Sequence, residues 1–307
     1  MKKEGLGIFI LMLVLLGITS CTKDADEDNG KLYIVTTTGM IGDAVANIVK
    51  DKAEVEALMG PGVDPHLYKA SQGDLSKLRE ADIIFYNGLH LEGKMGEILE
   101  KFGRQKKVLP VSDGLNKGKL LSAPGFSDVY DPHIWFDVAL WTQVVEYISQ
   151  QLQEFDAENS EYYRENAAEY LQALHDLHNW VGMEVSSIPQ QQRVLITAHD
   201  AFQYFGKAYN IEVKGLQGIS TLSEYGLQDI TSMVDFISNN KIKAVFVESS
   251  VPEKSLKAVV EGVEERGHSV RIGGTLYSDA MGAEGTPEGT YIGMVTANVN
   301  TIVSSLK

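Results

Sequence analysis

The chain has 307 residues, a length typical of about two domains. With 44% hydrophobic and 22% charged residues, its composition is that of an ordinary soluble protein with a proper core. The 42 Asp and Glu residues outnumber the 27 Lys and Arg residues and give a formal net charge of −15. A phosphate-neutralising surface is therefore disfavoured, and we expect no nucleic-acid partner. The single Cys excludes a framework of internal disulfides and a Cys-rich metal site.

The N-terminus has the pattern of an export signal. A basic start, Met1-Lys2-Lys3, precedes an apolar run over residues 6–18, which is too short for a membrane-spanning helix of about 20 residues. Residues 18–21, Ile-Thr-Ser-Cys, resemble the lipobox of bacterial lipoproteins, whose cysteine is diacylated and becomes the mature N-terminus. We therefore predict a lipid anchor at Cys21 that holds the exported protein at a bilayer of the cell envelope. The alternative is a buried cysteine that follows an ordinary signal peptide.

Short apolar runs rich in β-branched residues alternate with helical patterns along the rest of the chain. Continuous Ile and Val runs of this kind are typical of parallel strands that are covered on both faces, so the predicted fold class is α/β. Amphipathic patterns predict helices over residues 42–50, 71–80 and 227–239. The predicted strands cover residues 32–36, 55–59, 83–86 and 108–111 in the first half, and 194–197, 211–213, 244–248 and 270–272 in the second.

One long amphipathic helix is predicted between the two sets of strands. Residues 159–181 contain no Gly or Pro, and apolar residues recur there at steps of three and four. Ser160 is a suitable N-cap and Gly182 lies near the expected end. About 22 residues at 1.5 Å each span roughly 33 Å, the diameter of a small domain. We therefore expect a stiff connection that allows two lobes to tilt only modestly.

These elements predict five segments along the chain. Residues 1–20 form the signal peptide, and the polar, acidic residues 21–30 form a disordered tether. Residues 31–158 form an N-terminal α/β lobe, residues 159–182 the connecting helix and residues 183–307 a C-terminal α/β lobe. We expect the protein to be a monomer.

Four side chains that commonly bind metals lie just past the predicted strands: His66, His133, His199 and Asp279. Ligands of open parallel sheets bind beyond the carboxyl ends of the strands, which is where these residues lie. Two come from each half, and they are separated by 67, 66 and 80 residues. Such spacing cannot form a local metal knuckle, so a shared site has to lie where the two lobes face each other.

Three neutral imidazoles and one carboxylate suit Zn²⁺, or Mn²⁺ if the carboxylate binds through both oxygens. A helix dipole is expected to keep His199 neutral, as ligation requires. The alternative is that each histidine is a structural residue held by hydrogen bonds, and the residue types alone leave both interpretations open. Nearby residues that are candidates to hold the far ring nitrogens or to cover the site are Asp64, Asp131, Asp200, Glu248 and Trp135.

The segments around these four residues resemble those of a known family. Together with residues 35–42 and 87–92, they are similar to the TroA/ZnuA-like zinc and manganese substrate-binding lipoproteins of bacterial ABC importers. The resemblance covers residues 31–307. It is carried by Pro-His at 65–66, Asp-Pro-His-Ile-Trp at 131–135, Ala-His-Asp-Ala-Phe at 198–202 and Ser-Asp-Ala at 278–280.

The resemblance implies a receptor with two lobes joined by a long helix, a metal ion bound between the lobes, and delivery of this ion to an ABC-type permease. Carried over to this chain, the implied ligands are His66, His133, His199 and Asp279. The metal ion is then the transported ligand. No catalytic residue and no enzymatic activity are implied.

Two departures from the family pattern affect the choice of ion. Zinc-dedicated members often carry a His-rich loop before the second ligand, but residues 114–131 contain no His. Strict manganese members usually have Glu at the third position, where this chain has His199. Nitrogen ligands and the Irving–Williams order favour Zn²⁺ over Mn²⁺, so we predict zinc and keep manganese as the second possibility.

Two other functions are compatible with the same residues. A three-His zinc site with a bound water and Glu248 as general base is the arrangement of a hydrolase, although a fourth protein ligand at Asp279 would close the coordination sphere. A lipid-anchored protein at the cell surface could also serve as an adhesin. The remaining histidines, which we expect on helix faces and in turns, are His90, His175, His178 and His268.

Overall fold

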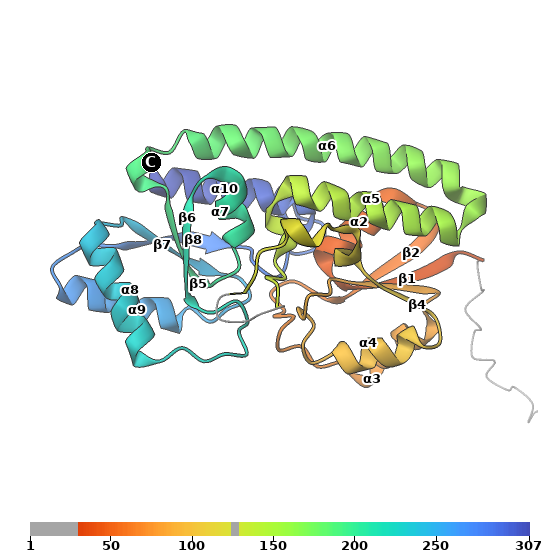
Figure 1. Cartoon of the computed structure of the whole chain (residues 1–307), viewed down its shortest axis with the longest axis horizontal. Helices are drawn as coiled ribbons and strands as arrows, with labels where there is room; N and C mark the ends of the chain where they lie inside the picture. Colours follow the sequence, from red (N-terminus) through yellow and green to blue (C-terminus); the bar gives the residue numbers. More distant parts are fainter. Residues whose placement is uncertain (1–29, 124–128) are drawn as a thin grey trace, which may run out of the picture. The chain divides into compact units, whose positions relative to one another are not determined.

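The computed structural model describes residues 30–123 and 129–307 (Figure 1). The predicted signal peptide, the predicted lipidation site Cys21 and nearly all of the predicted tether lie outside the described residues. Within the described part, no helix combines the length and the apolar character that crossing a membrane would require.

The first half of the chain forms a parallel four-stranded sheet in the order β2-β1-β3-β4. Alternate residues of its strands face opposite helical layers. Ile34 of β1 belongs to the hydrophobic cluster of α2, whereas Val35 belongs to the cluster of α3 and α4. The elements are β1 (Leu32–Thr38), α2 (Gly39–Val49), β2 (Ala53–Met59), α3 (Gln72–Glu80), β3 (Ile83–Tyr86), α4 (Gly96–Gly103) and β4 (Lys107–Pro110).

The second half repeats the arrangement with the order β6-β5-β7-β8. Helices α8 and α9 cover one face, where Val245 and Val247 of β7 are buried, and Phe246 between them points to the other face. All eight predicted strands are present, which confirms the α/β fold class. The elements are β5 (Val194–His199), α7 (Gln203–Tyr209), β6 (Glu212–Gln217), α8 (Leu227–Asn240), β7 (Ala244–Glu248), α9 (Lys254–Glu265) and β8 (Arg271–Leu276).

The predicted long helix is α6 (Ser160–Ser186), which follows α5 (Val138–Phe155). Its 27 residues span about 40 Å, longer than expected, because the helix continues through Gly182 to Ser186. Val185 extends the buried stripe of the helix by one more turn, and this burial offsets the cost of about 1 kcal/mol for a glycine inside a helix. Pro189 lies just beyond the end, where a helix cannot easily continue.

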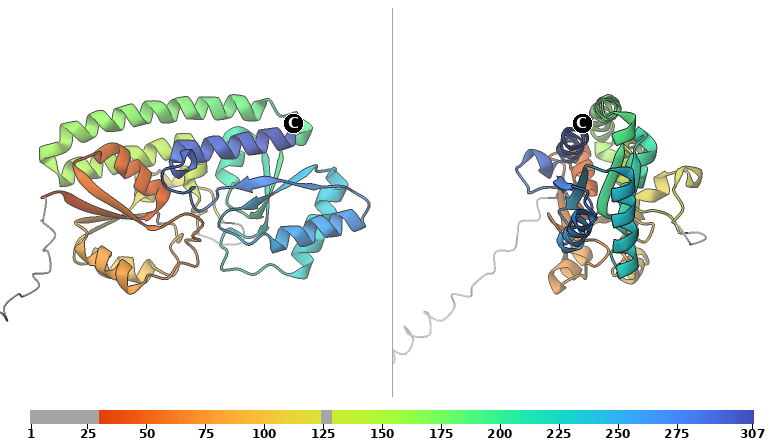
Figure 2. Two further views of the ribbon diagram at one scale, coloured as in Figure 1. Left: turned by 180° about the vertical axis from the view of Figure 1, so that it is seen from behind. Right: turned by 90° about the vertical axis from the view of Figure 1, so that its left-hand side faces the viewer.

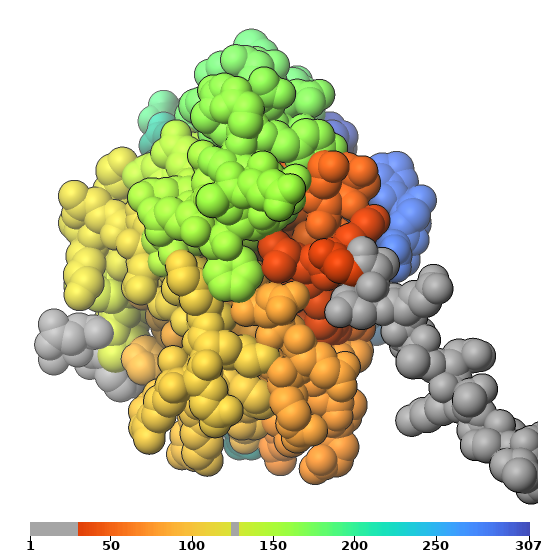
Figure 3. Space-filling view, turned by 90° about the vertical axis from the view of Figure 1, so that its right-hand side faces the viewer, coloured from red at the N-terminus to blue at the C-terminus, as the bar shows by residue number. Residues whose placement is uncertain are grey.

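A second helix also joins the two halves. Helix α10 (Tyr291–Leu306) contacts β8 of the second sheet as well as α6 and α2, and Figures 1 and 2 show it beside α6, which runs over both sheets. Figure 3 shows the molecule from the side of the N-terminal end of α6. The green residues around the α5–α6 connection lie above the red and orange residues of the first half. One hydrophobic cluster includes Ile34 and Phe85 of the first sheet and Leu195 and Phe246 of the second. The two sheets therefore share a core, which limits how far they can separate.

This shared core makes a testable prediction for α6. Replacing the fully buried Leu174 by Ala leaves a cavity, and we expect it to lower the free energy of unfolding by about 2–5 kcal/mol. Glu165→Ala on the exposed face of the same helix is the control and should change it by less than about 0.5 kcal/mol. Urea unfolding followed by circular dichroism measures both. Equal effects of the two substitutions would contradict the assigned packing.

Candidate metal centre

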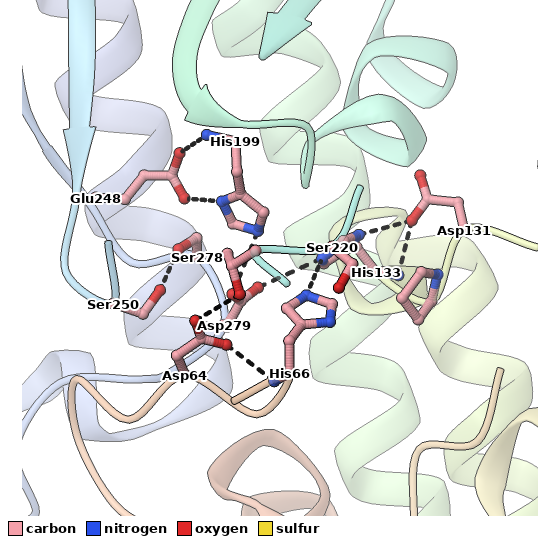
Figure 4. A network of polar contacts seen from close by, with 12 residues as sticks. Asp64, His66, Asp131, His133, His199, Ser220, Glu248, Ser250, Ser278 and Asp279 are labelled. Carbon is pink, nitrogen blue, oxygen red and sulfur yellow. Dashed lines mark hydrogen bonds and ion pairs between the residues drawn. The ribbon is translucent and has the colours of Figure 1, made fainter. Parts of the chain in front are cut away.

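His66, His133, His199 and Asp279 converge on one buried point (Figure 4). One possible ligand atom from each residue lies within 4.8 Å of those from the others. The Nε2 atoms of His66 and His133 are 3.4 Å apart. Asp279 turns Oδ1 toward His133 Nε2 at 3.5 Å and Oδ2 toward His199 Nε2 at 3.2 Å. Bonds of about 2.1 Å at a tetrahedral angle place neighbouring ligand atoms roughly 3.4 Å apart, so these distances suit a common ion.

The fold places all four residues at or beyond the carboxyl ends of strands, where ligands of open parallel sheets bind. His199 is the last residue of β5, and His66 lies in the loop between β2 and α3. Asp279 lies three residues after the end of β8. His133 is farther from its strand and directly precedes the short 3-10 helix Ile134–Phe136.

Buried carboxylates fix the rings of His133 and His199. Nδ1 of His133 lies 2.7 Å from Asp131 Oδ1, which also accepts a hydrogen bond from the His133 backbone N–H at 2.9 Å. Glu248 holds His199 with both oxygens: Oε2 lies 2.5 Å from Nδ1, and Oε1 accepts a hydrogen bond from the backbone N–H at 2.8 Å. A neutral ring that donates from Nδ1 keeps its lone pair on Nε2, the atom that faces the cluster.

Asp64 holds a loop and does not contact a ring nitrogen. One oxygen accepts a hydrogen bond from the backbone N–H of His66 at 2.9 Å, and the other accepts one from the Thr221 hydroxyl at 2.6 Å. Because Thr221 follows β6, this contact connects the two halves beside His66. Thr221 carries no motif, so the sequence contained no signal for its role.

The other two neighbours proposed from the sequence lie at different distances from the site. The Trp135 ring packs edge-on against His133 with its centroid 5.4 Å away and is buried, so it excludes water there. The Asp200 carboxylate accepts a hydrogen bond from the Gln203 side chain at 2.6 Å. Trp135 therefore borders the cluster, whereas Asp200 contacts the first residue of α7.

The four remaining histidines lie away from this cluster. His90 and His175 are exposed. His178 pairs with the Tyr209 hydroxyl at 3.0 Å, and His268 contacts the carbonyl oxygen of Ile242 at 2.7 Å. His175 lies on the exposed face of α6, as expected from the sequence, whereas these contacts leave His178 and His268 partly buried.

The charges in the cluster are strongly coupled. Burial lowers the pKa of His199, but the carboxylates of Glu248 and Asp279 outweigh burial and hold this pKa well above its usual range. Helix α7 begins only at Gln203, so the expectation that a helix dipole keeps His199 neutral was wrong.

Burial raises the pKa of Asp279, but the neighbouring imidazoles reverse the shift and leave it well below its usual range. Burial and two imidazoles lower the pKa of His66 to about 3.

Three buried atoms at the centre lack a hydrogen-bond partner among the described residues: both carboxylate oxygens of Asp279 and Nε2 of His199. Unpaired polar atoms in a protein interior are costly, and those that occur call for an explanation. A divalent cation at the centre would satisfy all three atoms together with the remaining two imidazoles. The donor set therefore fits a metal ion.

Comparisons with known proteins agree with this geometry. The family model "Zinc-uptake complex component A periplasmic" matches residues 34–305. The chain is 52% identical over 291 residues to the manganese-binding lipoprotein MntA of Bacillus subtilis, covering 95% of this chain and 94% of that protein. It is 46% identical over 309 residues to the zinc-binding protein TroA of Treponema pallidum, covering 100% of this chain and 99% of that protein.

A solved structure shows the same architecture. The periplasmic zinc-binding protein TroA from Treponema pallidum superposes with a TM-score of 0.88 at 47% identity, over 90% of this chain and 99% of that one. Both the matched family model and these relatives span nearly the whole folded part of the chain. The chain therefore belongs to the ZnuA/TroA family, the substrate-binding proteins of metal ABC transporters.

Proposed function

We propose that this protein captures one divalent transition metal ion with His66, His133, His199 and Asp279 and delivers it to an ABC-type permease. The observation that carries the proposal is the convergence of four ligand atoms within 4.8 Å, all buried and drawn from four distant segments. Four protein ligands close the coordination sphere, which is typical of a site that holds an ion. Membership of a substrate-binding family supports this function and gives no support to a hydrolase or an adhesin.

We propose Zn²⁺ as the ion that binds more tightly, with Mn²⁺ as the second candidate. Three imidazole nitrogens favour zinc, and in the Irving–Williams order a given site binds Zn²⁺ more tightly than Mn²⁺. Both Asp279 oxygens lack other partners, so the carboxylate is free to bind through both, which also suits manganese. The names of the relatives include both metals, manganese for MntA and zinc for TroA.

Capture replaces the water shell of the ion by three Nε2 lone pairs and the carboxylate. Asp131 and Glu248 keep two of the rings in the required orientation, so little rearrangement is needed when the ion arrives. Release requires the ligands of the two halves to separate. The shared core and the helices α6 and α10 restrict this movement to a modest tilt.

We also propose the organisation of the mature chain. Residues 1–20 are removed, Cys21 carries the lipid, residues 21–30 form a tether, and the receptor is a monomer. The lobes are residues 31–158 and 183–307, joined by residues 159–182. The relative MntA is named a lipoprotein, which supports an anchored, exported protein.

Metal titration tests the binding site. After stripping with a chelator, we expect about one Zn²⁺ per chain by calorimetry. His133→Ala removes one of four ligands and should weaken binding by more than about 100-fold, since even groups that only support ligands contribute 10- to 100-fold. His175→Ala, an exposed histidine on α6, is the matched control and should bind like the wild type. A wild type without a saturable site, or a His133→Ala protein with unchanged affinity, contradicts the proposal.

Metal affinity should fall as the pH is lowered. Because the carboxylates of Glu248 and Asp279 hold the pKa of His199 well above its usual range, a proton competes with the ion for this ring. Below the pKa of His199 the apparent affinity then falls about tenfold per pH unit. His66, with its pKa near 3, adds no proton competition above about pH 4. Chelator competition between about pH 5.5 and 8.5 measures the slope, and a flat profile would show that no proton is displaced.

Fractionation of host cells tests the anchor. Cys21→Ala removes the thiol that the lipid requires, so the variant should move from the membrane fraction to the soluble fraction while its Zn²⁺ affinity stays unchanged. Mass spectrometry of the wild-type N-terminal peptide should find a diacylglycerol on Cys21. An unmodified cysteine at this position would contradict the proposed anchor.

A further inference from the structure

Two hydrogen bonds cross between the halves next to the metal ligands. The indole N–H of Trp135, two residues after His133, donates to the carbonyl oxygen of Ser278 at 3.1 Å. Ser278 directly precedes Asp279. In the opposite direction the Tyr291 hydroxyl, at the start of α10, donates to the carbonyl oxygen of Trp135 at 2.7 Å. All of these residues are buried.

We propose that Trp135 and Tyr291 are positioning residues that hold His133 and Asp279, across the two halves, at the separation that two ligands of one ion require. This inference rests on the proposed function and adds the groups that set the geometry of the site. Each hydrogen bond ends on a main-chain atom within two residues of a ligand. A shift of Trp135 relative to Ser278 therefore changes the 3.5 Å distance between His133 Nε2 and Asp279 Oδ1.

Packing holds both aromatic side chains in place. The Tyr291 ring stacks on Trp141 of α5 with centroids 5.4 Å apart and an angle of 23° between the rings. The Trp135 ring is enclosed between His133 and Phe136, with centroid distances of 5.4 and 5.6 Å. Donors fixed in this way lose little conformational entropy when they form their hydrogen bonds.

The segment around His133 is held from the second half at further points. The Tyr204 hydroxyl of α7 donates to the Asp131 carbonyl oxygen at 3.0 Å. Phe136 stacks on Phe202, with centroids 4.1 Å apart. His133 thus belongs to the first half by sequence but is fixed to the second half by contacts. Its distance to Asp279 is consequently set by the protein, and the ion does not have to order these two ligands when it binds.

Tyr291→Phe tests this proposal with the smallest change, because it removes one hydroxyl and keeps the ring. We expect Zn²⁺ affinity to fall about tenfold, the lower end of the loss seen for groups that support ligands. Tyr163→Phe is the matched control. It removes the hydroxyl of Tyr163 on α6, which donates a hydrogen bond to Asp156 at 2.6 Å, and it should leave affinity unchanged. Trp135→Phe removes the second crossing hydrogen bond and should weaken binding at least as much.

A double-mutant cycle separates positioning from general destabilisation. If Tyr291 acts by positioning His133, Tyr291→Phe should have little effect on affinity in a His133→Ala background, where the imidazole is already lost. The absorption spectrum of the Co²⁺-loaded protein should also shift in Tyr291→Phe and Trp135→Phe, because it reports the ligand geometry, and should not shift in Tyr163→Phe.

The outcomes distinguish this inference from the proposed function. A wild type that binds one ion, with Tyr291→Phe and Trp135→Phe binding as tightly as Tyr163→Phe, overturns the positioning role and leaves the metal site intact. An equal fold-loss from Tyr291→Phe in the wild-type and His133→Ala backgrounds also overturns it. A wild type without a saturable site overturns the proposed function itself. Thermal unfolding of each metal-free variant verifies that the compared proteins are folded.

Discussion

Burying the Asp279 carboxylate costs several kcal/mol unless a cation or hydrogen-bond donors face it. Neither of its oxygens has a hydrogen-bond partner among the described residues, and the Nε2 atoms of His133 and His199 lie 3.5 and 3.2 Å from them. The rest of the site follows from this constraint. Two further carboxylates turn these rings so that lone pairs face Asp279, and the resulting cage requires positive charge at its centre.

The fold places such a cage between two sheets because of their topology. Parallel strands present their carboxyl ends at one edge, and here both sheets direct that edge toward the same space, so residues more than 60 positions apart become neighbours. The core that the two halves share through α5, α6 and α10 holds the two sheet edges in fixed positions relative to each other. The edge of a single sheet faces an ion from one side only, so two facing sheets are needed to surround it with buried side chains.

The residue pattern predicted the strands, because buried β-branched runs are a local signal. It also placed four metal-binding residue types just past the strands, but only the family resemblance assigned them as ligands of one ion. The residue pattern did not predict the features that depend on tertiary contacts. Helix α6 passes Gly182 because Val185 finds a place in the core. Asp64 binds a backbone N–H and Thr221, which no spacing indicates. Tyr291 resembles any aromatic residue at a helix start, and only the folded chain brings its hydroxyl to Trp135.

A proton competes with a metal ion for the centre of this cluster. His199 lies between Glu248 and Asp279, and these carboxylates hold its pKa well above the usual range. An ion that binds Nε2 replaces this proton at the same position. With Asp131, three buried carboxylates surround the cluster. A monovalent cation only substitutes for the proton, whereas a divalent ion adds a second positive charge, and this difference in charge favours exchange of the proton for a divalent metal.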